Sequence, residues 1–118
     1  MEVQKIELVV GDIKGNREIA YALLTAIQPY FVNQNVIEEE GKLTIESLLT
    51  DEYYSWDKLT TMIEEEKLRH LINVGQLFNL LKDSIYTYEL SPSNLVFSRN
   101  GNPLFIFRGV KGQVPPYD

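Results

Sequence analysis

A short apolar hairpin near the C-terminal end of the chain limits its possible folds more than any other segment. Residues 95–97 and 104–107 are two apolar strands, and Arg-Asn-Gly-Asn at residues 99–102 lies between them. The Asn-Gly step tolerates positive φ at both central positions of a tight turn, so the pattern predicts a β-hairpin. The neighbouring segments must therefore be compatible with an antiparallel strand pair.

The most regular segment of the sequence precedes this hairpin and predicts a helix from about residue 63 to 82. Three glutamates at residues 64–66 fall in its first turn, where they favour the positive end of the helix dipole. Apolar residues recur at helical spacing and predict the face that packs on the core. This predicted face consists of Leu68, Leu71, Ile72, Gly75, Phe78 and Leu81.

The first half of the chain predicts strands and one further helix. Asn16 can cap a helix from about residue 17 to 27, because asparagine is a preferred N-cap residue. One face of that helix carries Ile19, Leu23 and Ile27. Strands are predicted at residues 5–10, 42–46 and 85–88, and Ser55 can cap a short helical turn. The sequence therefore predicts an α+β fold.

Charge and composition exclude several classes of function. The 118 residues include 11 basic and 17 acidic side chains, giving a net charge of -6. Nucleic-acid binding and electrostatic attachment to anionic lipid both require a basic surface, so neither is expected. There is no cysteine, and no apolar run approaches the ~20 residues needed to span a bilayer. The chain as given is expected to be soluble.

The region around the hairpin resembles the catalytic core of a protein kinase. In kinases a loop carrying a catalytic Asp, and an Asn five residues later, leads into a hairpin that is followed by Asp-Phe-Gly. Here Glu89 and Asn94 match the Asp and Asn of the loop. Phe107, Arg108 and Gly109 match Asp-Phe-Gly.

The residues that would perform phosphoryl transfer are absent from this pattern. Transfer requires one carboxylate to orient the attacking hydroxyl and another to hold Mg²⁺. The metal-binding position is Phe107, which has no ligand atom, and Glu89 lacks the preceding His-Arg. No G-x-G-x-x-G phosphate loop occurs upstream. The sequence therefore predicts a protein that is not an enzyme and holds no cofactor or metal.

Three stretches resemble the EssB/YukC family of the bacterial type VII secretion machine. They are residues 66–74, residues 90–97, and residues 108–112 with 115–117. The resemblance is close over the second half of the chain and covers the first half in outline. It implies a degenerate protein-kinase-like fold with truncated or late-starting N-lobe strands. Residues 1–118 would form a single cytoplasmic pseudokinase-like domain at the cytoplasmic face of the cell membrane. The membrane helix of the longer single-pass protein would lie beyond Asp118.

The resemblance also implies a function. The domain would be a non-catalytic scaffold that binds an FtsK/SpoIIIE-type ATPase, supports export of WXG-type proteins and forms homodimers. A second hypothesis is a regulatory domain that binds nucleotide weakly through Glu89 and Asn94. The third is an unrelated small α+β interaction domain.

Several other residues suggest interaction sites. Tyr53, Tyr54 and Trp56 form either an exposed binding patch or a cover over the core, and the sequence favours neither reading. Arg108 follows an apolar strand, and an internal ion pair with Asp or Glu is the favoured interpretation. The alternative is that Arg108 fills the nucleotide site or, with Lys111, contacts a partner. His70, the single histidine, is expected on the helix surface and not in a metal site.

Overall fold

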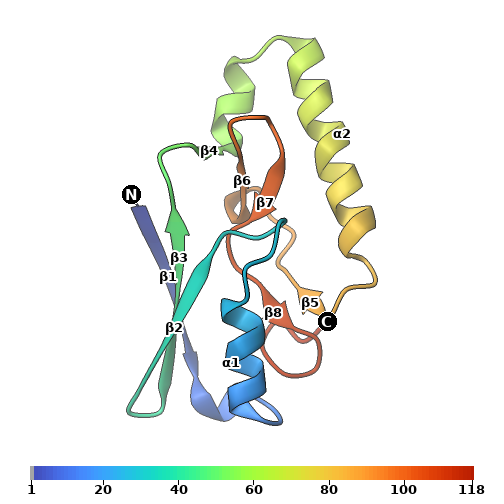
Figure 1. The fold of residues 1–118 in the computed structure, drawn as a ribbon. Coiled ribbons are helices and arrows are strands. Elements are labelled where there is room, and N and C mark those ends of the chain that lie inside the picture. The colour runs from blue at the N-terminus through green and yellow to red at the C-terminus, as the bar shows by residue number, and fades with distance from the viewer. Residues whose placement is uncertain (1) are drawn as a thin grey trace.

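Three small antiparallel sheets and two α-helices make up residues 2–118, the part of the chain that the computed structural model describes (Figure 1). The first sheet has the order β1-β3-β2 and contains the longest strands. The fold class, a mixed α+β arrangement, agrees with the prediction. The strands are β1 (Glu2–Val9), β2 (Gln34–Glu39), β3 (Lys42–Leu49), β4 (Tyr54–Ser55), β5 (Tyr86–Thr87), β6 (Leu95–Phe97), β7 (Pro103–Phe105) and β8 (Gly109–Val110).

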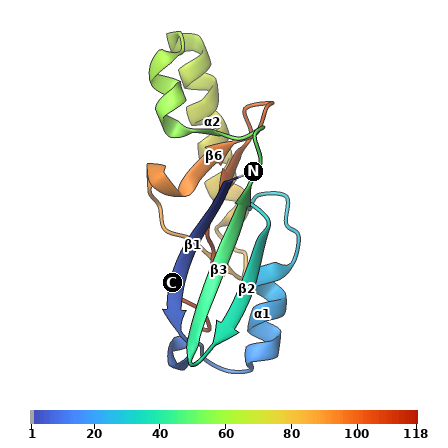
Figure 2. The ribbon, with the colours of Figure 1, turned by 90° about the vertical axis from the view of Figure 1, so that its left-hand side faces the viewer.

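The other two sheets are formed by the second half of the chain. One has the order β4-β6-β7, and the other pairs β5 with β8. The helices are α1 (Arg17–Thr25) and α2 (Glu64–Leu81), and short 3-10 turns occupy Val10–Asp12, Trp56–Thr61 and Pro92–Asn94. Figure 2 shows the first sheet face-on, with α1 beside β2. Helix α1 contacts both β2 and β8, so it joins the first sheet to the C-terminal part of the chain.

Strand β3 is the centre of the first sheet and carries its buried face. Leu43, Ile45, Ser47 and Leu49 alternate inward and are all buried. Alternation with period two is what one covered face of an antiparallel sheet requires. The predicted strands at residues 5–10 and 42–46 are confirmed. Their bounds differ by a few residues, because residues 10–12 leave β1 in a 3-10 turn.

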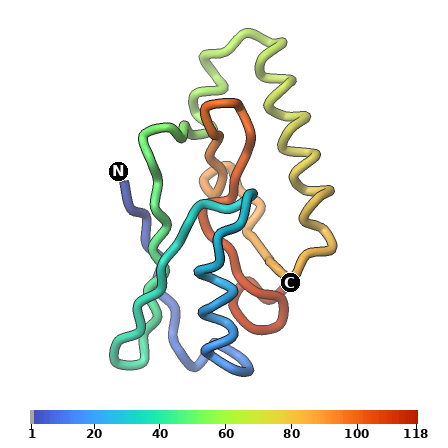
Figure 3. The backbone as a smooth tube through the Cα atoms, viewed as in Figure 1, coloured from blue at the N-terminus to red at the C-terminus, as the bar shows by residue number. Residues whose placement is uncertain are grey.

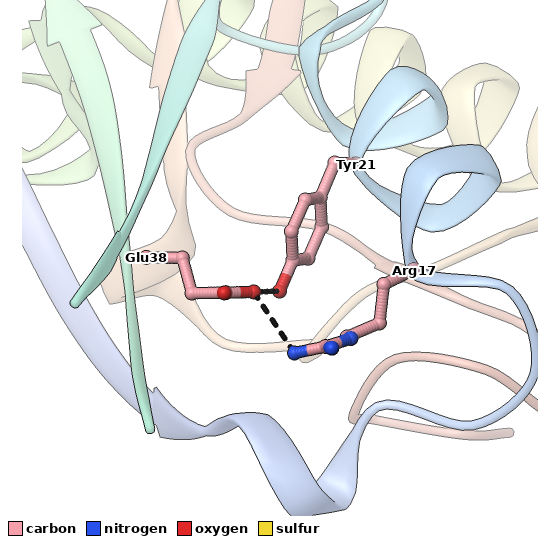
Figure 4. Close-up of polar contacts among 3 residues, drawn as sticks. All are labelled: Arg17, Tyr21 and Glu38. Atoms are coloured by element: carbon pink, nitrogen blue, oxygen red, sulfur yellow. Dashed lines mark hydrogen bonds and ion pairs between the residues drawn. The ribbon is translucent and has the colours of Figure 1, made fainter. Parts of the chain in front are cut away.

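Helix α1 begins as predicted, with the Asn16 side chain accepting a hydrogen bond of 3.1 Å from the Ile19 backbone N–H. On its surface, Arg17 and Tyr21 both reach Glu38 of β2, at 3.2 and 2.5 Å (Figure 4). The predicted apolar face of Ile19, Leu23 and Ile27 is wrong, because the buried residues are Ala20 and Leu24. Ala20 lacks a bulky side chain, so the helix can lie closely against the sheet on that side.

Helix α2 packs on the core with a different face from the one predicted. Its buried residues are His70, Val74, Leu77 and Leu81, and Leu81 is the single buried member of the predicted stripe. Leu68, Leu71 and Ile72 are exposed. The expectation that His70 lies on the surface is therefore also wrong. Burial of this polar ring is compensated by two hydrogen bonds, to Tyr54 Oη and to the Glu66 carbonyl, both of 2.7 Å.

The hairpin of β6 and β7 is confirmed, but its turn differs from the predicted one. Gly101 has a φ of +82°, and Asn100 does not have a positive φ. The Gly101 N–H donates to the Ser98 carbonyl at 2.9 Å, and the Ser98 N–H donates to the Asn102 carbonyl at 2.9 Å. The two strands are therefore connected by a turn in which only the glycine has a left-handed backbone conformation.

The C-terminal segment folds back on the connection between β1 and α1, as the chain trace shows (Figure 3). The Lys14 N–H donates to the Gln113 carbonyl at 2.8 Å, and Tyr117 Oη donates to the Asp12 carbonyl at 2.6 Å. The Lys14 ammonium also lies 4.4 Å from the Tyr117 ring centroid. These contacts hold the end of the described chain against the connection between β1 and α1 and fix the segment that follows β8.

Candidate functional site

Asn94 organises the loop that leads from β5 into the hairpin. Its side-chain amide donates to the carbonyls of Glu89, at 3.0 Å, and Phe107, at 3.3 Å. Its side-chain oxygen accepts a hydrogen bond of 2.9 Å from the Phe107 N–H. Because the Asn94 side chain is buried and bonded to backbone on three sides, it has a structural role in this arrangement.

The residues at the matched kinase positions do come together around one small cavity. Its volume is about 110 Å³, below the 300 Å³ or more that is typical of small-molecule sites. The Glu89 side chain is exposed at its edge, and Phe107 is half-buried. The lining residues are Ile6, Glu89, Asn94, Phe107, Arg108, Pro115 and Pro116. The Phe107 side chain offers this cavity aromatic carbon and no metal-ligating atom.

The guanidinium of Arg108 caps the C-terminal end of α1. One guanidinium nitrogen donates to the carbonyls of Leu23, Leu24 and Ala26, at 3.0, 2.9 and 2.6 Å. The last carbonyls of a helix lack partners within the helix and carry the negative end of its dipole, so a cation there is stabilising. The guanidinium carbon also lies 5.1 Å from the Phe31 ring centroid and 4.7 Å from that of Tyr86.

The predicted ion pair of Arg108 with an acidic residue is wrong. No carboxylate among residues 2–118 lies within ion-pair distance of its guanidinium. Arg108 is 2 % exposed, and two of its three guanidinium nitrogens have no hydrogen-bond partner. Burial lowers the pKa of this side chain, and the nearby Tyr86 partly offsets that effect. Carbonyl dipoles and aromatic rings have replaced the expected carboxylate, since both interact favourably with a cation.

Gly109 is required by the close approach of the C-terminal segment. A Cβ atom at this position would lie 2.5 Å from Thr87 Oγ1 and 2.6 Å from the Val114 carbonyl oxygen. The Thr87 hydroxyl donates a hydrogen bond to the Pro116 carbonyl, which closes the same contact. The glycine at this position therefore serves chain packing. Lys111, the next residue but one, is exposed.

The three aromatic residues of the 53–56 segment belong to both the core and the surface. Tyr54 stacks on Phe97 with ring centroids 5.7 Å apart, and Trp56 contacts the same ring at 6.2 Å. All three are half-buried and line a groove of about 410 Å³ between β1, β3 and β6. Glu2 and Asp57 add carboxylates to this groove. The reading as a cover over the core agrees with these ring contacts, and the same side chains also line a surface depression.

Sequence reasoning missed the partnership between Tyr54 and His70. Glu66 offers a carbonyl oxygen, which can only accept, so His70 Nδ1 donates to it and Nε2 accepts the Tyr54 hydroxyl. Burial raises the pKa of Tyr54, with a further contribution from Glu66. No spacing rule relates a two-residue strand to the middle of a helix 16 residues later, so the sequence carried no signal for this contact.

Metal binding and membrane crossing receive no support from the described residues. Within residues 2–118, no three or more His, Cys, Asp or Glu side chains gather in a way that could hold a metal ion. Of the helices in the same range, neither combines the length and apolar composition that crossing a membrane requires. The strand-lysine and helix-glutamate pair of kinases has no counterpart here either. In the pair that joins α1 to the first sheet, the helix supplies Arg17 and the strand supplies Glu38.

Comparison with known proteins identifies relatives of this chain. The family model described as "WXG100 protein secretion system (Wss), protein YukC" matches residues 9–118. The type VII secretion system protein EssB of Staphylococcus aureus strain USA300 is 31% identical over 110 residues, covering 93% of this chain. The chain spans 24% of the length of that relative.

Solved structures show the same fold. The crystal structure of the Staphylococcus aureus EssB cytoplasmic fragment superposes with a TM-score of 0.87 at 28% identity, covering 95% of this chain and 63% of the fragment. The Geobacillus thermodenitrificans EssB cytoplasmic fragment gives a TM-score of 0.78 at 17% identity, covering 97% and 54%, and shows likeness of fold alone. The chain belongs to the EssB/YukC family of the WXG100, or type VII, protein secretion system.

Proposed function

We propose that this chain is a non-catalytic scaffold of a type VII secretion machine, a pseudokinase-like domain whose role is to bind other components. The single observation that carries the proposal is Phe107. In sequence it matches the metal-binding Asp of the kinase pattern, and two hydrogen bonds between its backbone and the Asn94 side chain hold it in place. The loop thus keeps a defined shape without the groups that position magnesium and phosphate.

The kinase-like frame is part of the same proposal. Helix α2 leads through β5 into the loop that ends at Asn94, and the β6–β7 hairpin and Gly109 follow in the order that a kinase has. Ile6 of β1 lines the small cavity from the sheet side. The frame supports a pseudokinase reading because the order of elements is kept and the chemistry is replaced.

The partners follow from the family. The domain would contact the FtsK/SpoIIIE-type ATPase of the machine and support export of WXG-type proteins. It would stand at the cytoplasmic face of the membrane as part of a longer, dimeric single-pass protein. The groove beside Tyr53 and Trp56 is the surface we assign to the ATPase. Aromatic side chains at its wall and the carboxylates of Glu2 and Asp57 suit a partner with basic and apolar side chains.

Binding to the ATPase of the same genome tests the proposal. We expect its cytoplasmic region to bind the chain in titration calorimetry, and Asp57→Lys to weaken binding. Asp83→Lys reverses another exposed charge, just beyond the C-terminal end of α2, and serves as the matched control. Absence of binding, both to the isolated ATPase region and to the assembled machine, would contradict the scaffold function.

A regulatory domain that binds nucleotide is the second candidate. The observation that favours it is the groove of about 410 Å³, which lies within the size range of small-molecule sites. It stands apart from Phe107, so a nucleotide there would have no magnesium-binding carboxylate at that position. A rise in melting temperature on addition of ATP would favour this candidate, whereas the scaffold function predicts no rise.

A further inference from the structure

Two depressions in the protein surface meet along helix α2. Trp56 and Leu71 line both of them, so together they form one continuous groove, which we call the α2 groove. Its two parts have volumes of about 400 and about 220 Å³. In Figure 1, α2 lies at the edge of the molecule remote from the first sheet. The α2 groove is also lined by Leu59, Lys67, Gly75, Phe78, Leu90 and Pro92.

Most of the surface of the α2 groove is apolar and open to a partner. Leu71 on the helix and Leu90 on the opposite wall are 47% and 66% exposed. Leu68 lies one turn before Leu71 on the same helix and is exposed as well. Contiguous apolar surface of this kind marks an interaction site, whereas isolated exposed apolar residues do not.

The length and shape of the α2 groove suit an α-helix. From Lys67 to Phe78 the groove follows α2 for about 16 Å, or about three helical turns. Gly75 leaves a gap in this side of the helix, because a Cβ built on it meets no atom within 4 Å beyond the neighbouring helix backbone. Helices pack by inserting the side-chain ridge of one helix into such a gap in the other. An extended strand would need unpaired backbone groups, and the middle of a helix has none to offer.

Carboxylates stand at both ends of the α2 groove. Three exposed glutamates occupy residues 64–66 at the start of α2, and exposed Glu89 directly precedes the far wall. Glu64 contacts Lys67 at 3.4 Å, but its side chain is 93% exposed and such a surface pair adds little stability. Among residues 2–118, no ion pair involves Glu89. Both ends of the groove therefore favour a cationic partner.

We propose that the α2 groove binds an amphipathic helix of another protein, with an apolar ridge of about three turns and basic residues at both ends. The ridge lies between Leu71 and Leu90, and one of its large side chains enters the gap at Gly75. The basic ends meet the glutamates of residues 64–66 and Glu89. The helices of the described chain do not fit this pattern, because the last turns of α1 and α2 contain no basic residue.

This inference goes beyond the scaffold function and does not depend on it. The ATPase is assigned to the groove beside Tyr53 and Trp56, which borders the α2 groove at Trp56. Leu71 and Gly75 line only the α2 groove, whereas Asp57 lines only the ATPase groove. Variants at these positions therefore allow the two proposals to fail separately.

Fluorescence anisotropy with a labelled synthetic peptide tests the proposal. The probe is a helix of about 18 residues, or five turns, with leucines at the i, i+4 and i+7 positions and lysines at both ends. We expect saturable binding below about 1 mM and a gain of peptide helicity in circular dichroism. The same peptide with glutamates at its ends should bind at least about tenfold more weakly. Absence of saturable binding, equal binding of the two peptides, or binding without a gain of helicity would overturn the proposal.

Filling the gap at Gly75 locates the binding site. Gly75→Leu should weaken binding of the lysine-ended peptide at least about tenfold, because the new side chain occupies the space of the partner ridge. The variant should remain folded, since leucine is a better helix former than glycine. Gln76→Leu is the matched control, because it adds the same side chain at the next position, which lines a different groove with Leu80. Unchanged binding by folded Gly75→Leu, or equal losses in both variants, would contradict this site.

Charge reversal tests the two ends of the groove. The double variant Glu64→Lys with Glu89→Lys should bind the glutamate-ended peptide more tightly than the lysine-ended one, because the favourable and unfavourable charge pairs are exchanged. Glu18→Lys with Asp83→Lys reverses two exposed carboxylates that do not line the groove and is the control of equal net charge. A preference for lysine ends that survives the first pair of substitutions would exclude the α2 groove as the binding site.

Discussion

Asn94 holds both backbone groups of Phe107, accepting a hydrogen bond of 2.9 Å from its N–H and donating one of 3.3 Å to its carbonyl. A side-chain amide is suited to this double contact, because it offers a donor and an acceptor in one plane. The residue that a kinase would use near its metal thus serves here to fix the start of β8 against the preceding loop.

Replacing Asn94 tests this structural role. Asn94→Ala removes the side-chain partner of the Phe107 N–H and carbonyl, and we expect a loss of about 1–3 kcal/mol in the free energy of unfolding, measured by urea denaturation. Asn94→Asp should also destabilise, since a carboxylate cannot donate to the two carbonyls. Asn100→Ala alters an exposed turn residue and is the control, expected to change stability by less than about 0.5 kcal/mol.

Arg108→Ala should be among the most destabilising substitutions in the chain. It removes the donor shared by three helix-end carbonyls and empties the space between Phe31 and Tyr86. We expect a loss of about 3 kcal/mol or more in the free energy of unfolding. Arg108→Lys should recover only part of it, because an ammonium has no plane to lie against the rings. Arg99→Ala removes an exposed surface pair with Glu52 and should be nearly neutral, as judged by the same urea titration.

Gly109→Ala should displace the C-terminal segment from β5. The new methyl group would overlap the Val114 carbonyl, which belongs to backbone and has no alternative rotamer. We expect a loss of about 1–3 kcal/mol in calorimetric or urea unfolding. Gly11→Ala is the control, because the nearest atom to its added Cβ is 3.9 Å away. Equal stabilities of the two variants would contradict the packing role of Gly109.

Alkaline pH should destabilise the protein through its tyrosines. Burial raises the pKa of Tyr54 and Tyr88 above the ordinary value of 10.0, and it raises that of Tyr21 together with the hydrogen bond to Glu38. A raised pKa means that the folded chain holds the proton more tightly than the unfolded chain. The resulting stability is fully present below pH 10 and is lost as the pH rises through the folded values. Tyrosinate absorbance should therefore appear at a higher pH in the native protein than in the urea-unfolded protein. Tyr54→Phe should reduce this difference in pH.

Magnesium should make no difference to any interaction with ATP. In the proposed kinase-like frame Phe107 replaces the carboxylate that would coordinate it, so the melting temperature with Mg-ATP should equal that with ATP and a chelator. Ligand binding to the native state must raise the melting temperature, which makes the comparison sensitive. A rise that depends on Mg²⁺ would contradict the non-catalytic assignment.

The sequence predicted the elements of this fold better than their buried faces. The Asn16 cap, α2 and the β6–β7 hairpin could be located because capping residues, helical spacing and Asn-Gly steps are local signals. The core face of α2 could not, because apolar residues lie on both faces of the helix: Leu68, Leu71 and Ile72 are exposed, whereas His70 is buried. His70 is buried because the Tyr54 hydroxyl forms a hydrogen bond with its imidazole ring. Ala20 is buried because its small side chain permits close packing of α1.

The candidate site was also predicted only in part, because some of its contacts follow from local sequence signals and others do not. Glu89, Asn94 and Phe107 do gather around one cavity, as the spacing of a loop and a hairpin required. The partners of Arg108 could not be predicted, because they are main-chain carbonyls 82 to 85 residues earlier, and every residue has such a carbonyl. Contacts with main-chain atoms therefore cannot be recognised from the identity of the residues that make them.

That long-range cap has a consequence for how the protein is made. The end of α1 leaves the ribosome long before Arg108, whose guanidinium caps that end of the helix. The Val32 N–H likewise has its hydrogen-bond acceptor, the Phe105 carbonyl, only after residue 105 has been synthesised. The nascent N-terminal half therefore has no finished fold of its own during synthesis. Emergence of Arg108 and the segment that follows it should allow residues 2–118 to complete their fold, and a chain truncated before residue 108 should be degraded by proteases.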